Sequence, residues 1–167
     1  MLIASKYEEI YAPEVRDFVY ITDKTYSKEE ILQMEYKMLS ELSFETLHVS
    51  PYIFLKRFHF ITGESLKSFF LAQYILEFSF LEYKMLRYSS SIKAASSLYI
   101  ARKIMKVEQP WSHDLVQVSS YQDKDLKSCV RDICKILELI PRITLKACIN
   151  KFSSQKYMEV TKISMFS

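Results

Sequence analysis

The amino-acid sequence predicts an all-α protein, and three features carry that prediction. The chain of 167 residues contains one glycine, which argues against a β-rich fold with many tight turns and against a glycine-lined phosphate loop. Apolar residues recur at helical spacing through most of the chain. Helix-start signals, such as the capping box of Ser27 with Glu30 and the Ser50-Pro51 pair, precede several of these stretches.

The first predicted element is the end of a helix within the first fifteen residues. Leu2, Tyr7 and Ile10 follow helical spacing, and Pro13 disfavours a helical conformation in the residue before it. Lys6 is four residues from both Leu2 and Ile10, so it shares their apolar face. A lysine in that position either extends its ammonium to solvent or pairs with a carboxylate.

A candidate carboxylate for Lys6 lies on a later helix, predicted over residues 28–43. The capping box at residues 27 and 30 fixes its start. Glu35 falls inside the apolar stripe of this helix, which comprises Ile31, Met38 and Leu42. One cation and one anion therefore each occupy an apolar face on different helices. Two such departures from simple patterning indicate a functional site.

The helices that flank these two elements follow from the same signals. A short helix over residues 14–19 begins after a proline, which the first turn of a helix tolerates. The helix over residues 52–61 stops at Gly63, a residue type that accepts the left-handed conformation of a helix end. Residues 64–88 are apolar on most sides, which predicts a central helix in two segments with a bend near Phe80.

The C-terminal half predicts four more helices. Residues 90–105 contain a cluster of small side chains that permits close helix packing, and a short helix follows at residues 113–119. Residues 123–139 keep their apolar side chains in helical register up to a proline, and residues 143–152 form the last helix. The polar tail over residues 153–167 either docks or frays.

The chain contains an internal repeat. Residues 98–103 echo residues 1–6, a proline follows each at the same distance, and the later helices align so that Glu35 falls on Val130. This pattern predicts a duplicated helical domain. Because the second copy uses valine where the first has glutamate, Glu35 is not required for packing and is expected to serve an interaction. The first copy lacks the two helices that precede residues 98–103, so it is expected to be incomplete and to expose apolar surface.

The ordered motifs of the first copy resemble the cyclin box of a B-type mitotic cyclin. They are Ala4-Ser-Lys6-Tyr-Glu-Glu-Ile-Tyr-x-Pro13-Glu, Phe18-Val-Tyr-Ile-Thr-Asp23-x-Thr-Tyr26, and Met34-Glu35 before Leu42-x-Phe44. The resemblance implies that residues 1–46 are the C-terminal part of a first cyclin box. It further implies a second cyclin box at residues 47–152 and a C-terminal tail at residues 153–167. The substrate-docking patch that normally opens the first box has no counterpart in this sequence.

By this resemblance the chain is a regulatory subunit and not an enzyme. It is expected to bind and activate a cyclin-dependent protein kinase as a heterodimer in G2 and mitosis, in the nucleus and cytoplasm. The residues matching the family's kinase-gripping pair are Lys6 and Glu35. Apolar contacts around them are expected from Tyr7, Ile10, Leu39, Phe44 and Leu47.

Other chemistries find little support in the sequence. The formal charge of +3 is small for a nucleic-acid-binding protein, and the basic pairs Lys56-Arg57 and Arg102-Lys103 are typical of solvated surface. The three cysteines are odd in number and form no CxxC pair, which indicates reduced thiols in an intracellular protein. The scattered histidines predict no metal site, and no cofactor, small-molecule substrate or membrane span is expected. Two alternatives remain open: a transcription-factor-like relative that reads DNA, and a truncated helical scaffold without kinase binding.

Overall fold

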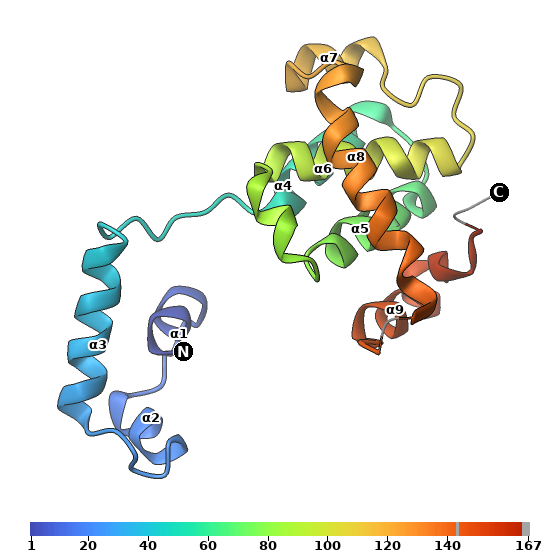
Figure 1. Cartoon of the computed structure of the whole chain (residues 1–167). Coiled ribbons are helices and arrows are strands. Elements are labelled where there is room, and N and C mark those ends of the chain that lie inside the picture. Colours follow the sequence, from blue (N-terminus) through green and yellow to red (C-terminus); the bar gives the residue numbers. More distant parts are fainter. Residues whose placement is uncertain (143, 165–167) are drawn as a thin grey trace. The chain divides into compact units, whose positions relative to one another are not determined.

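The computed structural model describes residues 1–142 and 144–164, and these residues form helices and connecting segments without a strand (Figure 1). The all-α prediction is therefore confirmed. The chain divides into two compact units, Met1–His48 and Val49–Ser167.

The first unit contains three helices, α1 (Leu2–Glu8), α2 (Val15–Ile21) and α3 (Lys28–Glu41). Reciprocal capping boxes begin both α2 and α3, as the Ser27 and Glu30 pattern predicts for α3. Helices α2 and α3 pack against each other. The residues that this unit buries are Leu2, Ser5 and Phe18. None of the 14 residues of α3, all of them described by the structure, is buried.

Helix α1 ends earlier than the sequence indicates. It stops at Glu8, and Glu9 takes an extended conformation, so Ile10 lies outside the helix. Ile10 and Tyr11 are almost fully exposed. A helix of this length has little stability of its own, and no burial of Ile10 or Tyr11 supports a further turn.

The second unit contains six α-helices and four short 3₁₀ segments within its described residues. The α-helices are α4 (Pro51–Thr62), α5 (Leu66–Ser79), α6 (Ser90–Ile104), α7 (His113–Ser119), α8 (Asp123–Glu138) and α9 (Ala147–Phe152). The 3₁₀ segments are η1 (Tyr83–Arg87), η2 (Ile140–Arg142), η3 (Gln155–Tyr157) and η4 (Val160–Lys162). The predicted break near Phe80 separates α5 from η1. The predicted start of the last helix at residue 143 lies outside the described residues, and α9 begins at Ala147.

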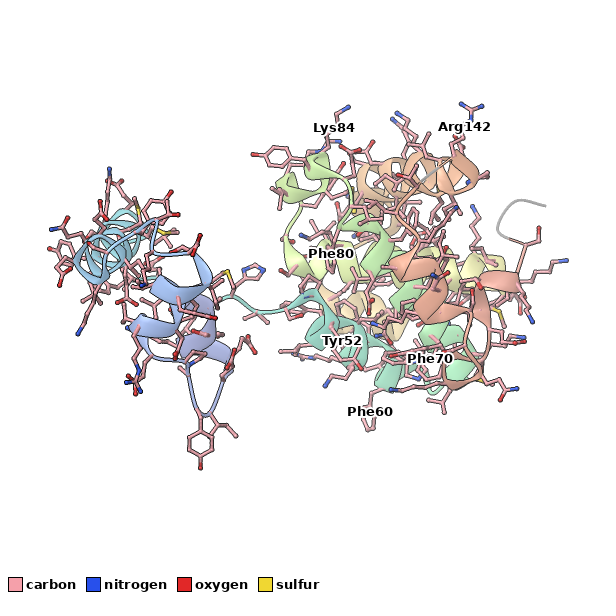
Figure 2. All side chains as sticks on the ribbon, turned by 90° about the horizontal axis from the view of Figure 1, so that it is seen from below. Tyr52, Phe60, Phe70, Phe80, Lys84 and Arg142 are labelled. Carbon is pink, nitrogen blue, oxygen red and sulfur yellow. The ribbon has the colours of Figure 1, made fainter. Side chains whose placement is uncertain are left out.

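Helices α5 and α6 form the centre of the second unit, with α4, α8 and α9 packed around them (Figure 1). Ten residues of α5 are buried, because this helix is apolar on most of its surface. Small residues such as Ala94 and Ala95 let α6 approach its neighbours closely. Outside this core Phe60 and Lys84 project from the surface (Figure 2).

The basic pair Arg102-Lys103 is not uniformly solvated, contrary to the expectation from sequence. Lys103 is exposed, but Arg102 is buried on α6. The Arg102 guanidinium donates from Nε to Glu64 Oε1 at 2.6 Å and from Nη1 to the carbonyl oxygen of Pro110 at 2.8 Å. A buried arginine is tolerated here because its donors are satisfied.

The helices of the predicted repeat recur in the same order in both units. Helices α6, α7 and α8 follow one another as α1, α2 and α3 do, and the aligned positions of the sequence fall on matching helices. In the second unit, α4 and α5 pack on α6. The first unit has no such pair before α1 among the residues that the structure describes, and its helices keep much apolar surface exposed.

Candidate functional site

The two charged residues singled out from the sequence form an ion pair between α1 and α3. Lys6 Nζ lies 2.9 Å from each of the two carboxylate oxygens of Glu35. The Lys6 side chain is 49% exposed and the Glu35 side chain is 14% exposed. The sequence left two alternatives for Lys6, which were extension to solvent and pairing with a carboxylate. In the structure both apply, because the side chain is half exposed and its ammonium pairs with Glu35.

Local structure explains how the two helices present this pair. On α1, Leu2 is buried and the Ser5 hydroxyl donates to the Leu2 carbonyl, which leaves the following residue, Lys6, at the edge of the packed face. Glu35 lies in the middle of α3, whose start is fixed by its capping box. Bidentate pairing orients the ammonium and the carboxylate relative to each other.

Apolar side chains accompany the pair in the first unit. Tyr7 follows Lys6 on α1, and Leu39 lies one turn beyond Glu35 on α3. Ile10 lies beyond α1, whereas Phe44 and Leu47 lie beyond the end of α3. Leu39 is half-buried and the other four are exposed.

Two further apolar residues of α3 were not included among the expected contacts. Met38 and Leu42 were assigned to the packed stripe around Glu35, but each keeps about half of its surface exposed. They add to the exposed apolar surface of the first unit. The spacing signal was present, because Met38 lies three residues after Glu35 and Leu42 three after Leu39.

The second unit has no equivalent ion pair at the matching positions. Lys103, which aligns with Lys6, is exposed, and its ammonium lies 5.9 Å from the centroid of the Tyr99 ring. Val130 occupies the position of Glu35 and is half-buried in α8. The charged pair is therefore a property of the first unit and not of the repeated helical framework.

Residues 1–142 and 144–164 contain no group of three metal-ligating side chains. Nor do these residues include a helix long and apolar enough to cross a bilayer.

The three cysteines are free thiols with suppressed acidity. Burial raises the pKa of Cys129 and of Cys148 to about 11, and it also raises the pKa of Cys134. We expect native Cys148 to react with iodoacetamide at pH 8 about 100-fold more slowly than the same thiol in urea, since two pKa units remove that fraction of thiolate. Mass spectrometry after timed alkylation measures the two rates.

The raised pKa values of the thiols also make folding stability depend on pH. Below the ordinary thiol pKa both folded and unfolded thiols are protonated, so their contribution to folding stability is fully present there. It is lost progressively as pH rises from about 9 to about 11, because the unfolded thiols ionise first. Equal alkylation rates in the native and urea-unfolded protein would contradict the burial of Cys148.

Comparison with known proteins independently supports the resemblance to cyclins. The family pattern described as cyclin, N-terminal domain, matches residues 1–47, and the one described as cyclin, C-terminal domain, matches residues 49–165. The chain is 39% identical over 168 residues to Cyclin-A1-1 of Oryza sativa subsp. japonica, covering 97% of this chain and 33% of that protein. It is 40% identical over 168 residues to Cyclin-A1-1 of Arabidopsis thaliana, covering 97% and 36%.

A relative named as a B-type cyclin is similar to the same degree. The G2/mitotic-specific cyclin-B of Spisula solidissima is 39% identical over 164 residues, covering 98% of this chain and 38% of that protein. The chain thus spans little more than a third of the length of these relatives.

Proposed function

The chain belongs to the cyclin family, and on this premise we propose that it is a regulatory subunit that binds and activates a cyclin-dependent protein kinase. The observation that supports this most directly is the Lys6–Glu35 ion pair, whose lysine is half exposed, in a first unit that also exposes many apolar side chains. Residues 1–46 act as the C-terminal part of the first cyclin box, and residues 47–152 as the second. Residues 153–167 form the tail.

The narrower proposal is a B-type cyclin acting in G2 and mitosis. The motifs of the first unit and the similarity to a relative named G2/mitotic-specific cyclin-B support it, while A-type relatives are similar to the same degree. The chain acts inside the cell, in the nucleus and cytoplasm, where its free thiols stay reduced.

The mechanism is a population shift in the kinase. The first unit docks on the mobile regulatory helix of the kinase and favours the orientation in which the kinase's own Lys–Glu pair forms. Lys6 and Glu35 supply charge-assisted hydrogen bonds to the kinase backbone, because each has bonding capacity beyond their mutual contact. Around the pair the apolar contact comes from Tyr7, Ile10, Leu39, Phe44 and Leu47.

Two alanine variants test this proposal. We expect Lys6→Ala and Glu35→Ala each to weaken binding to a recombinant mitotic cyclin-dependent kinase by about tenfold or more, since each removes charge-assisted hydrogen bonds. The free energy of unfolding should fall by only about 1 kcal/mol or less, because Lys6 is half exposed. Affinity per folded molecule is measured by calorimetry and stability by urea unfolding.

The repeat offers a matched control for these variants. Lys103 occupies the position of Lys6 in the second unit, so Lys103→Ala removes the same charge from an equivalent helix and should leave kinase affinity unchanged. If either test variant unfolds the protein and leaves the affinity of the folded fraction intact, the ion pair is structural. Absence of any kinase binding by the parent chain would favour a scaffold role, and a salt-dependent DNA shift would favour a nucleic-acid-binding relative.

A further inference from the structure

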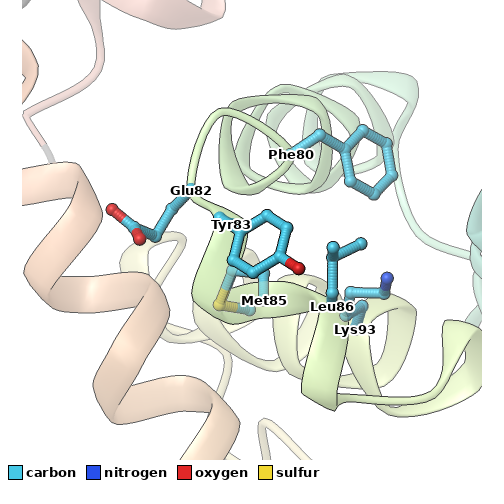
Figure 3. A pocket seen from close by; sticks show the side chains of 6 residues that line it. All are labelled: Phe80, Glu82, Tyr83, Met85, Leu86 and Lys93. Carbon is cyan, nitrogen blue, oxygen red and sulfur yellow. The ribbon is translucent and has the colours of Figure 1, made fainter.

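A second candidate binding site lies within the second unit, where the end of α5 meets η1 and α6. A cavity of about 320 Å³ opens here (Figure 3). Its lining consists of Phe80, Glu82, Tyr83, Met85, Leu86 and Lys93. Met85 is buried, whereas Phe80, Tyr83 and Leu86 are exposed around it. The lining is therefore mostly apolar, with one carboxylate, that of Glu82, and one ammonium, that of Lys93.

The position of η1, which forms one wall, is fixed by polar contacts to α8. Arg87 pairs with Asp132, and the Tyr88 hydroxyl donates to the same carboxylate at 2.7 Å. The Tyr88 hydroxyl also lies 2.9 Å from that of Ser128. These contacts anchor the C-terminal end of η1 to α8.

Lys93 is the unusual member of this lining. It lies in the second turn of α6 and is only 7% exposed. Its ammonium lies 5.6 Å from the centroid of the Phe80 ring, and it takes part in none of the ion pairs formed by residues 1–142 and 144–164. The Glu82 carboxylate is directed away from it, on the opposite side of η1 (Figure 3).

The Lys93 side chain is largely covered, but its ammonium keeps access to solvent at the open cavity and is not a buried group without a partner. The Phe80 ring adds a cation–π contact on one side of the ammonium. An ammonium has three donors, however, and a ring engages it from one side only. What the cavity lacks is an anion at Lys93.

We propose that this cavity binds a short segment of another protein in which a bulky apolar side chain adjoins an aspartate or glutamate. The carboxylate pairs with Lys93, and the apolar side chain packs on Phe80 and Leu86 beside the Tyr83 ring. The volume is near the lower end for ligand sites, which suits one or two side chains and excludes most larger ligands. All of the residues involved lie in the second unit, so the proposal is independent of kinase binding through Lys6 and Glu35.

A pair of probe peptides tests this proposal on the full chain. The acidic probe is acetyl-Gly-Phe-Asp-Gly-amide, and the neutral probe carries asparagine in place of aspartate. We expect the acidic probe to bind about tenfold more tightly in an NMR titration, since it alone gains the charge-assisted contact. Lys93→Met should abolish this difference, because methionine fills similar space without charge.

The control variant is Lys84→Met, which removes an exposed charge from η1 that points away from the surface (Figure 2). It should leave the preference for the acidic probe intact. Equal binding of the two probes to the parent chain would overturn the proposal, as would persistence of the preference in Lys93→Met. Binding of decanoate without binding of either peptide would also overturn it, in favour of a lipid carboxylate.

Folding of the variant provides a second readout. Lys93→Met should melt no lower than the parent chain, because Lys93 forms no ion pair within the described residues and methionine fills similar space. A lower melting temperature would mean that the lysine serves the fold, and the inference would then fail. An unchanged or higher melting temperature of Lys93→Met, together with loss of acidic-probe binding, supports the proposed site.

Discussion

Replacing Arg102 by alanine is expected to lower the free energy of unfolding of the second unit by about 3–5 kcal/mol. The Arg102 and Glu64 side chains are only 7% and 16% exposed, so their ion pair is largely desolvated. Glu64 also accepts a hydrogen bond from the Ser68 hydroxyl at 2.7 Å, and Arg102 donates to the Pro110 carbonyl. Removing the guanidinium leaves a buried carboxylate and a carbonyl without their cationic partner.

The neighbouring residue provides the control. Lys103→Ala removes the same charge from the adjacent, exposed position of α6, and its effect on stability should stay within about 0.5 kcal/mol. The chain has one tryptophan, Trp111, which is buried in the second unit and donates from Nε1 to the Tyr121 carbonyl. Its fluorescence during urea unfolding therefore measures the second unit. A loss below about 1 kcal/mol for Arg102→Ala would show that the pair contributes little to the fold.

Local signals in the sequence predicted the helices well. The capping box at Ser27 and Glu30 fixed the start of α3, and Gly63 adopts the left-handed conformation with φ of +60° at the end of α4. The break after α5 lies at Phe80, where a bend was predicted within the long apolar stretch over residues 64–88. These features depend on residues within a few positions of each other, which is why periodicity and capping reveal them.

Features that depend on distant residues were harder to predict. Glu64 and Arg102 are 38 residues apart, and nothing in their spacing indicates that folding brings them together. The Lys6–Glu35 pair, 29 residues apart, could be suggested only because each residue violated the apolar pattern of its own helix. The exposure of Met38 and Leu42 depends on what covers α3, which helical spacing does not reveal.

The amides of α1 to α3 are expected to exchange with solvent at least about 100-fold faster than those of α5 and α6. The apolar residues that the first unit buries are Leu2 and Phe18, and short helices have little stability without packing. By contrast α5 alone buries ten residues. Hydrogen exchange followed by mass spectrometry resolves the two units by their peptides.

The effect of a kinase on these exchange rates tests the proposed kinase-binding function. A partner that binds only the folded first unit stabilises it by mass action, so a saturating mitotic cyclin-dependent kinase should slow exchange in α1 to α3 and leave α5 and α6 unchanged. Glu35→Ala should reduce this protection, because the kinase then binds more weakly. Slow exchange of α1 to α3 in the free chain would show that the first unit is stable without a partner. Protection confined to the second unit would instead place kinase contact away from Lys6 and Glu35.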